Sequence, residues 1–387
     1  MREAIQPMLG TAIDRIPVAG MSLAVILLVR EETGSFATAG LVEAAFAVAL
    51  AISLPIQGRL IDRLGQTGIL AAAVVLNPIA LIALILAARA GADPAVLVAI
   101  GAASGGTQAA TGSAMRALWS TLIPDGSLRQ SAYALDAVSL EVAFIAGPLV
   151  TAVLVASGSP ALAVLVNGGF AMVGTLIFLA SRASRAWRGH AGAGDWAGPL
   201  RSRGIVALLL VEVAFGVSLG AMEISITAFA TEEGSSSSAG VLIAFQAAAS
   251  LVAGLWYGSR HHASAPGDRY PRICLLLAAG MVPLLFTTSI PEAIPMMIIS
   301  GLALAPAGTV LYALIDELAP RGTATEAFTW MVTAISSGVA AGSALGGTLV
   351  SGGHPHRGLL ATVVAAAAAG VIAYAARPSF RPATSAA

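Results

Sequence analysis

Long apolar runs separated by short polar clusters dominate the sequence. A helix needs about 20 mostly apolar residues to cross the hydrocarbon core of a bilayer. Runs of this length, bounded by Arg, Asp, Pro or Gly-Ser clusters, predict an all-α integral membrane protein of twelve transmembrane helices. They cover residues 11–30, 37–57, 67–89, 94–120, 131–156, 160–181, 204–230, 237–257, 271–289, 293–315, 325–350 and 357–376.

The composition agrees with lipid as the solvent. Of the 387 residues, 57% are hydrophobic and only 10% are charged, whereas a soluble domain carries about 25% charged residues. The net charge is zero, so no basic surface predicts a nucleic-acid partner. The sequence has one cysteine and no HExxH motif, catalytic triad or metal-ligand cluster. We therefore expect no enzyme activity, no metal and no cofactor.

The arginines orient the predicted helices. All twenty basic residues are Arg; with the N-terminus inside, fifteen fall on the inner side and only Arg30, Arg89 and Arg357 on the outer side. Positive residues gather on the cytoplasmic side of membrane proteins. We therefore expect a multi-pass protein of the inner (plasma) membrane, with both termini in the cytoplasm.

The chain repeats itself after 200 residues. Thirty-nine residues starting at Gly20 match those starting at Gly220 at 11 positions without a gap, among them Glu32 with Glu232. The predicted parts are an N-terminal six-helix bundle (1–181), a polar cytoplasmic central loop (182–203) and a C-terminal six-helix bundle (204–387). Two parallel pseudo-repeats of six helices can rock about a site between them, which favours a transporter over a channel or a membrane enzyme.

A polar motif follows the second predicted helix. It reads Gly58-Arg-Leu-Ile-Asp62-Arg63-Leu-Gly65-Gln, and it resembles the G-x-L-x-D-R-x-G-R/K signature loop of the major facilitator superfamily. With the helix count, the central loop and the repeat, the resemblance covers essentially the whole chain. It implies a gate in which Gly58 allows close helix approach, while Asp62 and Arg63 make charge and helix-end contacts. The alternative is that Asp62 and Arg63 form a solvated turn that only helps topology.

A second, partial resemblance lies in the fifth predicted helix. Gly147-Pro148 resembles the Gly-Pro motif that antiporters of the superfamily carry there, although a bend used only for packing is the alternative. Those antiporters often carry an Arg in the middle of the fourth helix. Here that position has Gly105-Gly106-Thr107-Gln108, and the only basic residue of the helix is Arg116, nearer the cytoplasmic end. Proton coupling is therefore left open.

Ionisable residues within the predicted helices are the candidates for coupling. Glu141 and Glu223 are favoured, because burial disfavours the charged form of a carboxyl group and makes proton exchange possible near neutral pH. Glu212 and Glu223 are eleven residues apart, which places both on one helix face. The other candidates are Glu43, Glu212, Arg116 and Asp316. The alternative for each is a protonated or paired side chain that serves packing.

Polar residues at helical spacing predict the lining of a central, mostly apolar cavity. In the fourth helix Thr107, Gln108 and Thr111, together with Ser104, share one face of a continuous helix. The corresponding candidates in the tenth and eleventh helices are Thr309, Tyr312 and Thr333. Hydrogen bonding between helices is the alternative for each set.

These patterns together predict a secondary active transporter. We expect a monomer that exports small organic molecules across the plasma membrane by alternating access, with the lipid bilayer as its surroundings and proton-coupled antiport left open. An uptake permease of the same fold and a non-transporting membrane sensor are the alternatives. The identity of the substrate depends on helix contacts that the sequence does not define.

Overall fold

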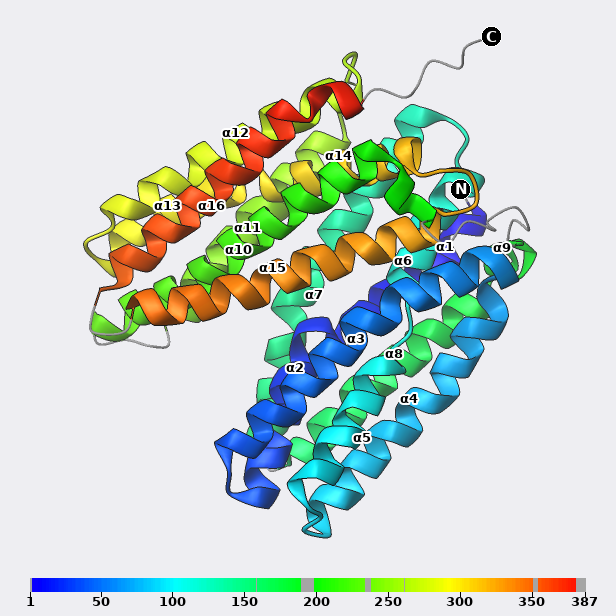
Figure 1. Cartoon of the computed structure of the whole chain (residues 1–387), viewed down its shortest axis with the longest axis vertical. Coiled ribbons are helices and arrows are strands. Elements are labelled where there is room, and N and C mark those ends of the chain that lie inside the picture. Colours follow the sequence, from blue (N-terminus) through cyan, green and yellow to red (C-terminus); the bar gives the residue numbers. More distant parts are fainter. Residues whose placement is uncertain are drawn as a thin grey trace. The chain divides into compact units, whose positions relative to one another are not determined.

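The described part of the chain is built from helices. The computed structural model describes residues 2–157, 159–188, 198–233, 238–260, 262–350 and 354–380, and it contains no strand within them (Figure 1). In chain order the helices are α1 (Arg2–Arg15), α2 (Pro17–Thr33), α3 (Phe36–Leu64), α4 (Gln66–Arg89), α5 (Pro94–Gly106), α6 (Thr111–Leu122), α7 (Gly126–Ala156), α8 (Pro160–Ala180), α9 (Arg182–Ala186), η1 (Gly198–Arg201), α10 (Arg203–Glu232), α11 (Ser238–Gly258), α12 (Pro266–Met281), η2 (Val282–Phe286), α13 (Ile290–Gly301), α14 (Leu304–Leu318), α15 (Ala324–Val350), α16 (Pro355–Ala375) and η3 (Arg377–Phe380).

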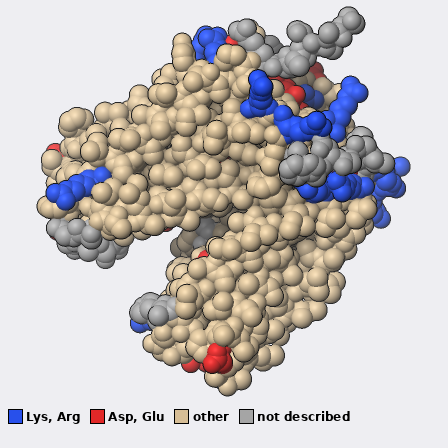
Figure 2. Space-filling model, viewed as in Figure 1, with Lys and Arg blue, Asp and Glu red and all other residues tan. Residues whose placement is uncertain are grey.

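The helices confirm the prediction of an all-α membrane protein. Within the described residues, eleven helical segments are long and apolar enough to cross a membrane. They correspond to eleven of the twelve predicted helices. Figure 2 shows the surface expected for such a chain, since charged side chains occupy only a few places on the visible face.

The fourth predicted helix departs from the expectation. Residues 94–120 form two helices, α5 and α6, that are separated at residues 107–110, so the prediction of one continuous helix there was wrong. The break follows a close packing contact: a Cβ added to Gly105 would lie 2.7 Å from the carbonyl carbon of Phe46 in α3. Thr107, Gln108 and Thr111 consequently do not share one face of a regular helix.

Two amides satisfy the backbone groups that this break exposes. Gln57 donates to the Gln108 carbonyl at 2.8 Å and accepts from the Ala110 N–H at 3.2 Å. Asn77 donates to the Ser104 carbonyl at 2.8 Å. Backbone polar groups at membrane depth need partners within the protein, because lipid offers none. The break is thus a supported feature of the fold.

The chain divides into two compact units. Unit 1 comprises residues 1–124, 142–198 and 321–329, and unit 2 comprises residues 125–141, 199–320 and 330–387. Unit 1 therefore contains the first turns of α15, and unit 2 contains the first half of α7. The predicted boundaries at 181 and 204 follow the sequence repeat and remain a prediction; residues 189–197 of the central loop lie outside the described residues.

Each unit has its own apolar core. In unit 1, α2, α3, α4, α5 and α8 contribute fully buried side chains such as Val25, Val42, Leu84 and Val164. In unit 2, the core gathers residues of α10, α11, α12, α13 and α16, among them Ile226, Leu242, Met281, Ala293 and Leu359. Helices within a membrane gain stability mainly from close packing, because lipid is as apolar as the side chains themselves.

Glycine contacts repeat from one unit to the other. In unit 1, a Cβ on Gly20 would lie 3.0 Å from the carbonyl carbon of Gly147 in α7. In unit 2, a Cβ on Gly220, 200 residues later, would lie 2.8 Å from the backbone nitrogen of Ser343 in α15. Gly105 likewise packs on Phe46, and Gly301 packs on Gln246. Gly20 and Gly220, 200 residues apart, thus both make close helix contacts.

Candidate functional site: the contact of α3 with α15

The predicted signature motif forms the end of α3. Gly65 ends this helix with a positive φ of 96°, and its N–H donates to the Ile61 carbonyl at 2.8 Å. A residue with a Cβ rarely adopts this backbone conformation, which explains the glycine. The turn places Asp62 in the last turn of α3, with its side chain only 2% exposed.

Asp62 binds the N-terminus of another helix. Its Oδ1 accepts a hydrogen bond from the Thr325 N–H at 3.2 Å, and its Oδ2 accepts one from the Glu326 N–H at 2.8 Å. Both donors belong to the first turn of α15, whose N–H groups have no partner within their own helix. A carboxylate is stabilised there by these donors and by the positive end of the helix dipole. Asp62 therefore acts as an N-cap supplied by a distant part of the chain.

An ion pair lies next to this cap. Arg59 Nε lies 3.1 Å from both carboxylate oxygens of Glu326, and an Arg59 Nη2–Glu326 Oε1 contact completes the pair. The Glu326 side chain is 4% exposed and that of Arg59 is 33% exposed. The guanidinium offsets the repulsion between the neighbouring carboxylates of Asp62 and Glu326.

Gly58 brings the two helices close enough for these bonds. A Cβ at this position would lie 2.8 Å from the Glu326 Cα. Because that neighbour is backbone, the clash would require the helices to separate. Close helix approach, which the motif implied for Gly58, is thus what the structure contains.

Arg63 does not make the charge contact that the motif implied. Its side chain is exposed, and within the described residues it makes no hydrogen bond or ion pair. The ion pair comes from Arg59, which directly follows Gly58, where α3 lies against the Glu326 backbone. The expectation of a charge contact by Arg63 is corrected accordingly.

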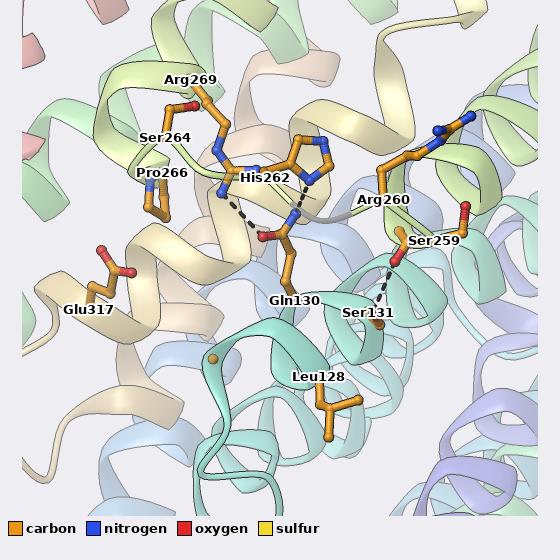
Figure 3. A pocket seen from close by; sticks show the side chains of 12 residues that line it. Leu128, Gln130, Ser131, Ser259, Arg260, His262, Ser264, Pro266, Arg269 and Glu317 are labelled. Atoms are coloured by element: carbon orange, nitrogen blue, oxygen red, sulfur yellow. Dashed lines mark hydrogen bonds between the residues drawn. The ribbon is translucent and has the colours of Figure 1, made fainter.

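Unit 2 contains the corresponding junction, at the end of α11. Ser131 of α7 donates to the Gly258 carbonyl at 2.9 Å, and Gln130 bonds to His262 Nδ1 at 3.0 Å. Figure 3 shows Gln130 between His262 and Arg269, whose Nη2 donates to Gln130 Oε1 at 3.2 Å. His262 lies 200 residues after Asp62. The second repeat thus has a serine, a glutamine and a histidine where the first has a carboxylate.

The coupling candidates of unit 2 do not form one cluster. Ser250 donates to Glu141 Oε1 at 2.9 Å and also accepts from the Ala305 N–H, at the start of α14, at 3.1 Å. Tyr270 donates to Glu212 at 3.0 Å. Asp316 pairs with Arg129 at 3.1 Å.

The remaining coupling candidates are also separate. Glu223 is exposed although Glu212 is buried, so the shared face of α10 has different surroundings along its length. In unit 1, Ser22 donates to Glu43, whose second oxygen is buried without a described partner. Arg116 is buried in α6. Glu141 and Glu43 thus share one pattern, a carboxyl group bonded to a serine.

Several predicted cavity residues take part in helix packing. Thr111 and Thr175 share a hydrogen bond of 3.0 Å between α6 and α8. Thr309 is buried and donates to the Ala305 carbonyl within its own helix. Tyr312 stacks edge-on against Tyr133, with ring centroids 6.2 Å apart. These contacts support the alternative of helix packing for the three residues.

Three other predicted cavity residues are less enclosed. Thr107 donates to the Ala103 carbonyl at 2.8 Å and receives a longer contact, 3.4 Å, from Asn77. Gln108 and Thr333 are half-buried. Gln108 lies in the break between α5 and α6, where its carbonyl, and not its side chain, is the group that Gln57 binds.

Gly147 and Pro148 lie inside the continuous helix α7. A Cβ on Gly147 would lie 3.2 Å from the Gly20 nitrogen, and Thr151, one turn later, donates to the Gly20 carbonyl at 3.1 Å. The Gly-Pro pair thus accompanies a tight contact of α7 with α2, which supports the packing alternative. Within the described residues, no group of three or more His, Cys, Asp or Glu lies together as metal ligands would.

Comparison with known families identifies the fold. The family model of the Major Facilitator Superfamily matches residues 8–343. The chain belongs to the major facilitator superfamily. It is therefore a membrane transporter with a small-molecule substrate, and not an enzyme.

Solved structures of other superfamily members resemble the whole chain. A bacterial homologue of the iron transporter ferroportin in its outward-facing state has a TM-score of 0.77 at 16% identity, covering 97% of this chain and 99% of that one. The human organic anion transporter MFSD10 (TETRAN) has a TM-score of 0.75 at 15% identity, covering 96% and 99%. The transporter FucP in the outward conformation has a TM-score of 0.73 at 15% identity, with the same coverage. No curated protein matches the sequence.

The structure also draws attention to residues that the sequence patterns did not single out. Glu326 was one, although Thr323-Ala-Thr-Glu326 has the Thr-x-x-Glu pattern of a capping box at a helix start. Gln57 and Asn77 were others, and polar amides within apolar runs were the available signal. Asp136, buried in α7, was also passed over among the charges within helices.

Proposed function

We propose that this superfamily member exports small organic molecules by alternating access, and that the α3–α15 contact is its cytoplasmic gate. The observation that carries the proposal is the capping of the first turn of α15 by Asp62. This contact joins a helix of the first sequence repeat to one of the second. A transporter that alternates needs such contacts on one side of the membrane to form and to break in every cycle.

The chemistry of the contact suits a reversible gate. Hydrogen bonds to a charged group contribute about 1.5–3 kcal/mol each, and the partly exposed ion pair of Arg59 with Glu326 contributes about 1 kcal/mol or less. The sum is large enough to favour the closed state and small enough for substrate binding to overcome. An apolar interface of the same size would lack hydrogen bonds of defined direction that form and break together.

The substrate class follows from the sparse charge of the helices. Most of the acids within the spans are bonded to neutral or cationic side chains, as Glu141 is to Ser250 and Asp316 is to Arg129. A site built among such groups suits a lipophilic or mildly polar organic molecule. The organic anion transporter among the similar structures is consistent with an organic substrate, although its likeness concerns the fold.

Export and proton coupling are the finer parts of the proposal. Export rests on the partial resemblance of Gly147-Pro148 to the antiporter motif, and the packing of Gly147 on α2 is the competing explanation for the pair. Glu141 and Glu223 are the favoured proton carriers, and Glu43 joins them because, like Glu141, it has a serine as its hydrogen-bond partner. We place the protein in the plasma membrane with both termini in the cytoplasm, in agreement with the distribution of arginines.

Transport in proteoliposomes tests the proposal. Purified protein is reconstituted with a panel of fluorescent organic cations, anions and neutral compounds, with and without a pH gradient. Outward flux in protein of known orientation is the expected result, and Asp62→Asn should slow it with little loss of folded protein. Asp93→Asn is the matched control, because Asp93 caps α5 by a local bond to the Ala95 N–H.

The alternatives predict other outcomes. Inward flux would identify an uptake permease, and a ligand-induced thermal shift without flux would identify a non-transporting sensor. Unchanged transport by Asp62→Asn would remove the gate, whatever the direction of flux.

A further inference from the structure

A polar pocket of about 360 Å³ lies within unit 2, and its described lining includes none of the residues of the α3–α15 contact. It is formed by the first turns of α7, the end of α11 with the segment that follows it, the start of α12 and the end of α14 (Figure 3). Its lining includes Gln130, Arg260, His262, Ser264, Arg269 and Glu317. Neither the gate nor the coupling candidates account for it.

Arg269 is the unusual member of this lining. It is only 8% exposed, yet no described carboxylate forms an ion pair with it. Its Nη1 donates to the Tyr257 hydroxyl at 2.7 Å and its Nη2 to Gln130 Oε1 at 3.2 Å, while its Nε has no acceptor. Arginine does not lose its proton in proteins. The pocket therefore holds a buried positive charge whose described hydrogen-bond partners are neutral, with one donor left unused.

A buried charge without a counter-charge is expensive. The penalty for removing an ion from water is several kcal/mol, and neutral hydrogen bonds recover only part of it. Tyr257 also presents its ring to the guanidinium, with the Arg269 Cζ 5.9 Å from the ring centroid. This contact too is attractive without neutralising the charge. A bound anion would supply the missing partner.

The rest of the lining favours an anion. Arg260 adds a second positive charge, held with its Cζ 5.4 Å from the centroid of the Trp256 ring, and Ser264 adds a hydroxyl donor. Among the described residues of the lining, Glu317 is the one acidic side chain. Figure 3 shows Glu317 and Arg260 on opposite sides of Arg269. The positive charges thus outnumber the negative one.

The depth of the pocket relative to the bilayer indicates which anions it can meet. α11 ends at Gly258 and α12 begins at Pro266, so the pocket lies where membrane-crossing helices emerge from the hydrocarbon. Lipid phosphates and their glycerol groups occupy this level. Arginine binds phosphate oxygens with paired N–H donors, and the volume exceeds that of a bare phosphate ion.

We propose that this pocket binds a phosphate ester that pairs with Arg269, supplied either by a phospholipid headgroup or by a soluble glycerophosphate. The bound phosphate occupies the side of Arg269 on which Nε lacks an acceptor, and Arg260 and Ser264 bind its other oxygens. Through the Arg269–Gln130 bond it steadies the first turns of α7 against α12. The site is independent of the direction of transport and of the gate at Asp62.

Binding measurements on the delipidated full-length protein test the proposal. The probes are sn-glycerol 3-phosphate in neutral detergent, and micelles doped with either phosphatidylglycerol or phosphatidylcholine. We expect saturable binding of glycerol phosphate, of phosphatidylglycerol, or of both, detected by calorimetry and by a raised unfolding temperature. Binding of glycerol phosphate identifies a soluble source, and binding of phosphatidylglycerol alone identifies the headgroup. Failure of both probes to bind would overturn the proposal.

Variants locate the binding in the pocket. Arg269→Gln and Arg260→Gln should each weaken binding about tenfold or more, and Arg260 is exposed, so its variant keeps the test available should Arg269→Gln fail to fold. Arg272→Gln is the matched control, since Arg272 is an exposed arginine of α12 outside the pocket lining. Equal weakening by Arg272→Gln, or none by Arg260→Gln, would contradict the site.

A substitution of Glu317 should strengthen binding, whereas the arginine substitutions weaken it. If an anion occupies the pocket, Glu317→Gln removes a repulsive charge and strengthens binding several-fold. If Glu317 itself is the counter-charge of Arg269, the same variant lowers the unfolding temperature and leaves binding unimproved. The sign of the change therefore separates the proposal from its simplest competitor.

Discussion

The two repeats hold corresponding junctions with different chemistry. In unit 1, the end of α3 meets the start of α15 through a carboxylate, two backbone N–H groups and an ion pair. In unit 2, the end of α11 meets the start of α7 through a serine, a glutamine and a histidine. Glycines 200 residues apart, Gly58 and Gly258, bring the helices together in both. Shared geometry with unequal charge indicates that the first junction is the stronger and more directional of the two.

Substitution of the junction glycine Gly58 should have the largest effect on transport. Gly58→Ala should lower transport at least tenfold, because the added methyl group meets the backbone of Glu326 and overpacking of this kind costs about 1–3 kcal/mol. Gly68→Ala is the control, since nothing lies within 4 Å of a Cβ there. Transport by both variants is measured in proteoliposomes at equal amounts of folded protein.

The corresponding substitution in unit 2 sharpens this contrast. Close to a Cβ on Gly258 lies the methyl group of Ala134, so Gly258→Ala should impair transport, and Ala134→Gly added to it should restore the rate. No side-chain trimming should rescue Gly58→Ala. Failure of Ala134→Gly to rescue would mean that the second junction is not held as the structure indicates.

Removing the charge of Asp62 comes next in size. Asp62→Asn keeps one acceptor oxygen but loses the charge that faces the start of α15, so transport should fall about tenfold. His262→Gln at the corresponding position should have a smaller effect, because a neutral hydrogen bond contributes about 0.5–1.5 kcal/mol. Initial rates of both variants are compared. Equal losses of transport rate in the two variants would contradict the claim that the first junction is stronger than the second.

Three acids within the helices, Glu141, Glu223 and Glu43, extend the comparison to proton coupling. Glu141→Gln and Glu223→Gln should each flatten the pH dependence of transport, since a glutamine carries no exchangeable carboxyl proton. Glu43→Gln tests whether the corresponding acid of unit 1 shares the role. Glu212→Gln is the control, because Glu212 is bonded to Tyr270 within a packed interior. Wild-type profiles in all three test variants would exclude these acids as proton carriers.

The ion pair should give the smallest effect. A double-mutant cycle with Arg59→Gln and Glu326→Gln should yield a coupling free energy of about 1 kcal/mol or less, since Arg59 is partly exposed. The cycle is measured as changes in the free energy of unfolding. A coupling of several kcal/mol would make the ion pair, and not Asp62, the dominant element of the contact.

The sequence predicted the helices and the motif residues of the site better than the distant residues that they bind. Apolar run lengths located the membrane helices, because the bilayer imposes a minimum length on each. The motif pointed to Gly58, Asp62 and Gly65 through the local needs of a helix end. It did not point to Glu326, which lies 264 residues after Asp62, because such pairing arises only when distant helices pack.

The dependence on contacts between distant helices also explains two wrong predictions, the role of Arg63 and the continuity of the fourth helix. The motif alone pointed to Arg63 and not to Arg59, whereas the position at which α3 lies against α15, at Gly58, decides which arginine can pair. The fourth helix was read as continuous, because its run of small apolar residues carries no proline or charge at the break. The break depends on support from Gln57 and Asn77, in other helices.

One distance measurement tests the gate most directly. Spin labels are attached at Leu64 and Arg321, exposed residues at the end of α3 and just before α15, in a Cys274→Ser background in lipid nanodiscs. We expect two distance populations in the presence of substrate, and a shift toward the longer one in Asp62→Asn. A single distribution that neither substrate nor Asp62→Asn alters would contradict the proposal that this contact opens and closes during transport.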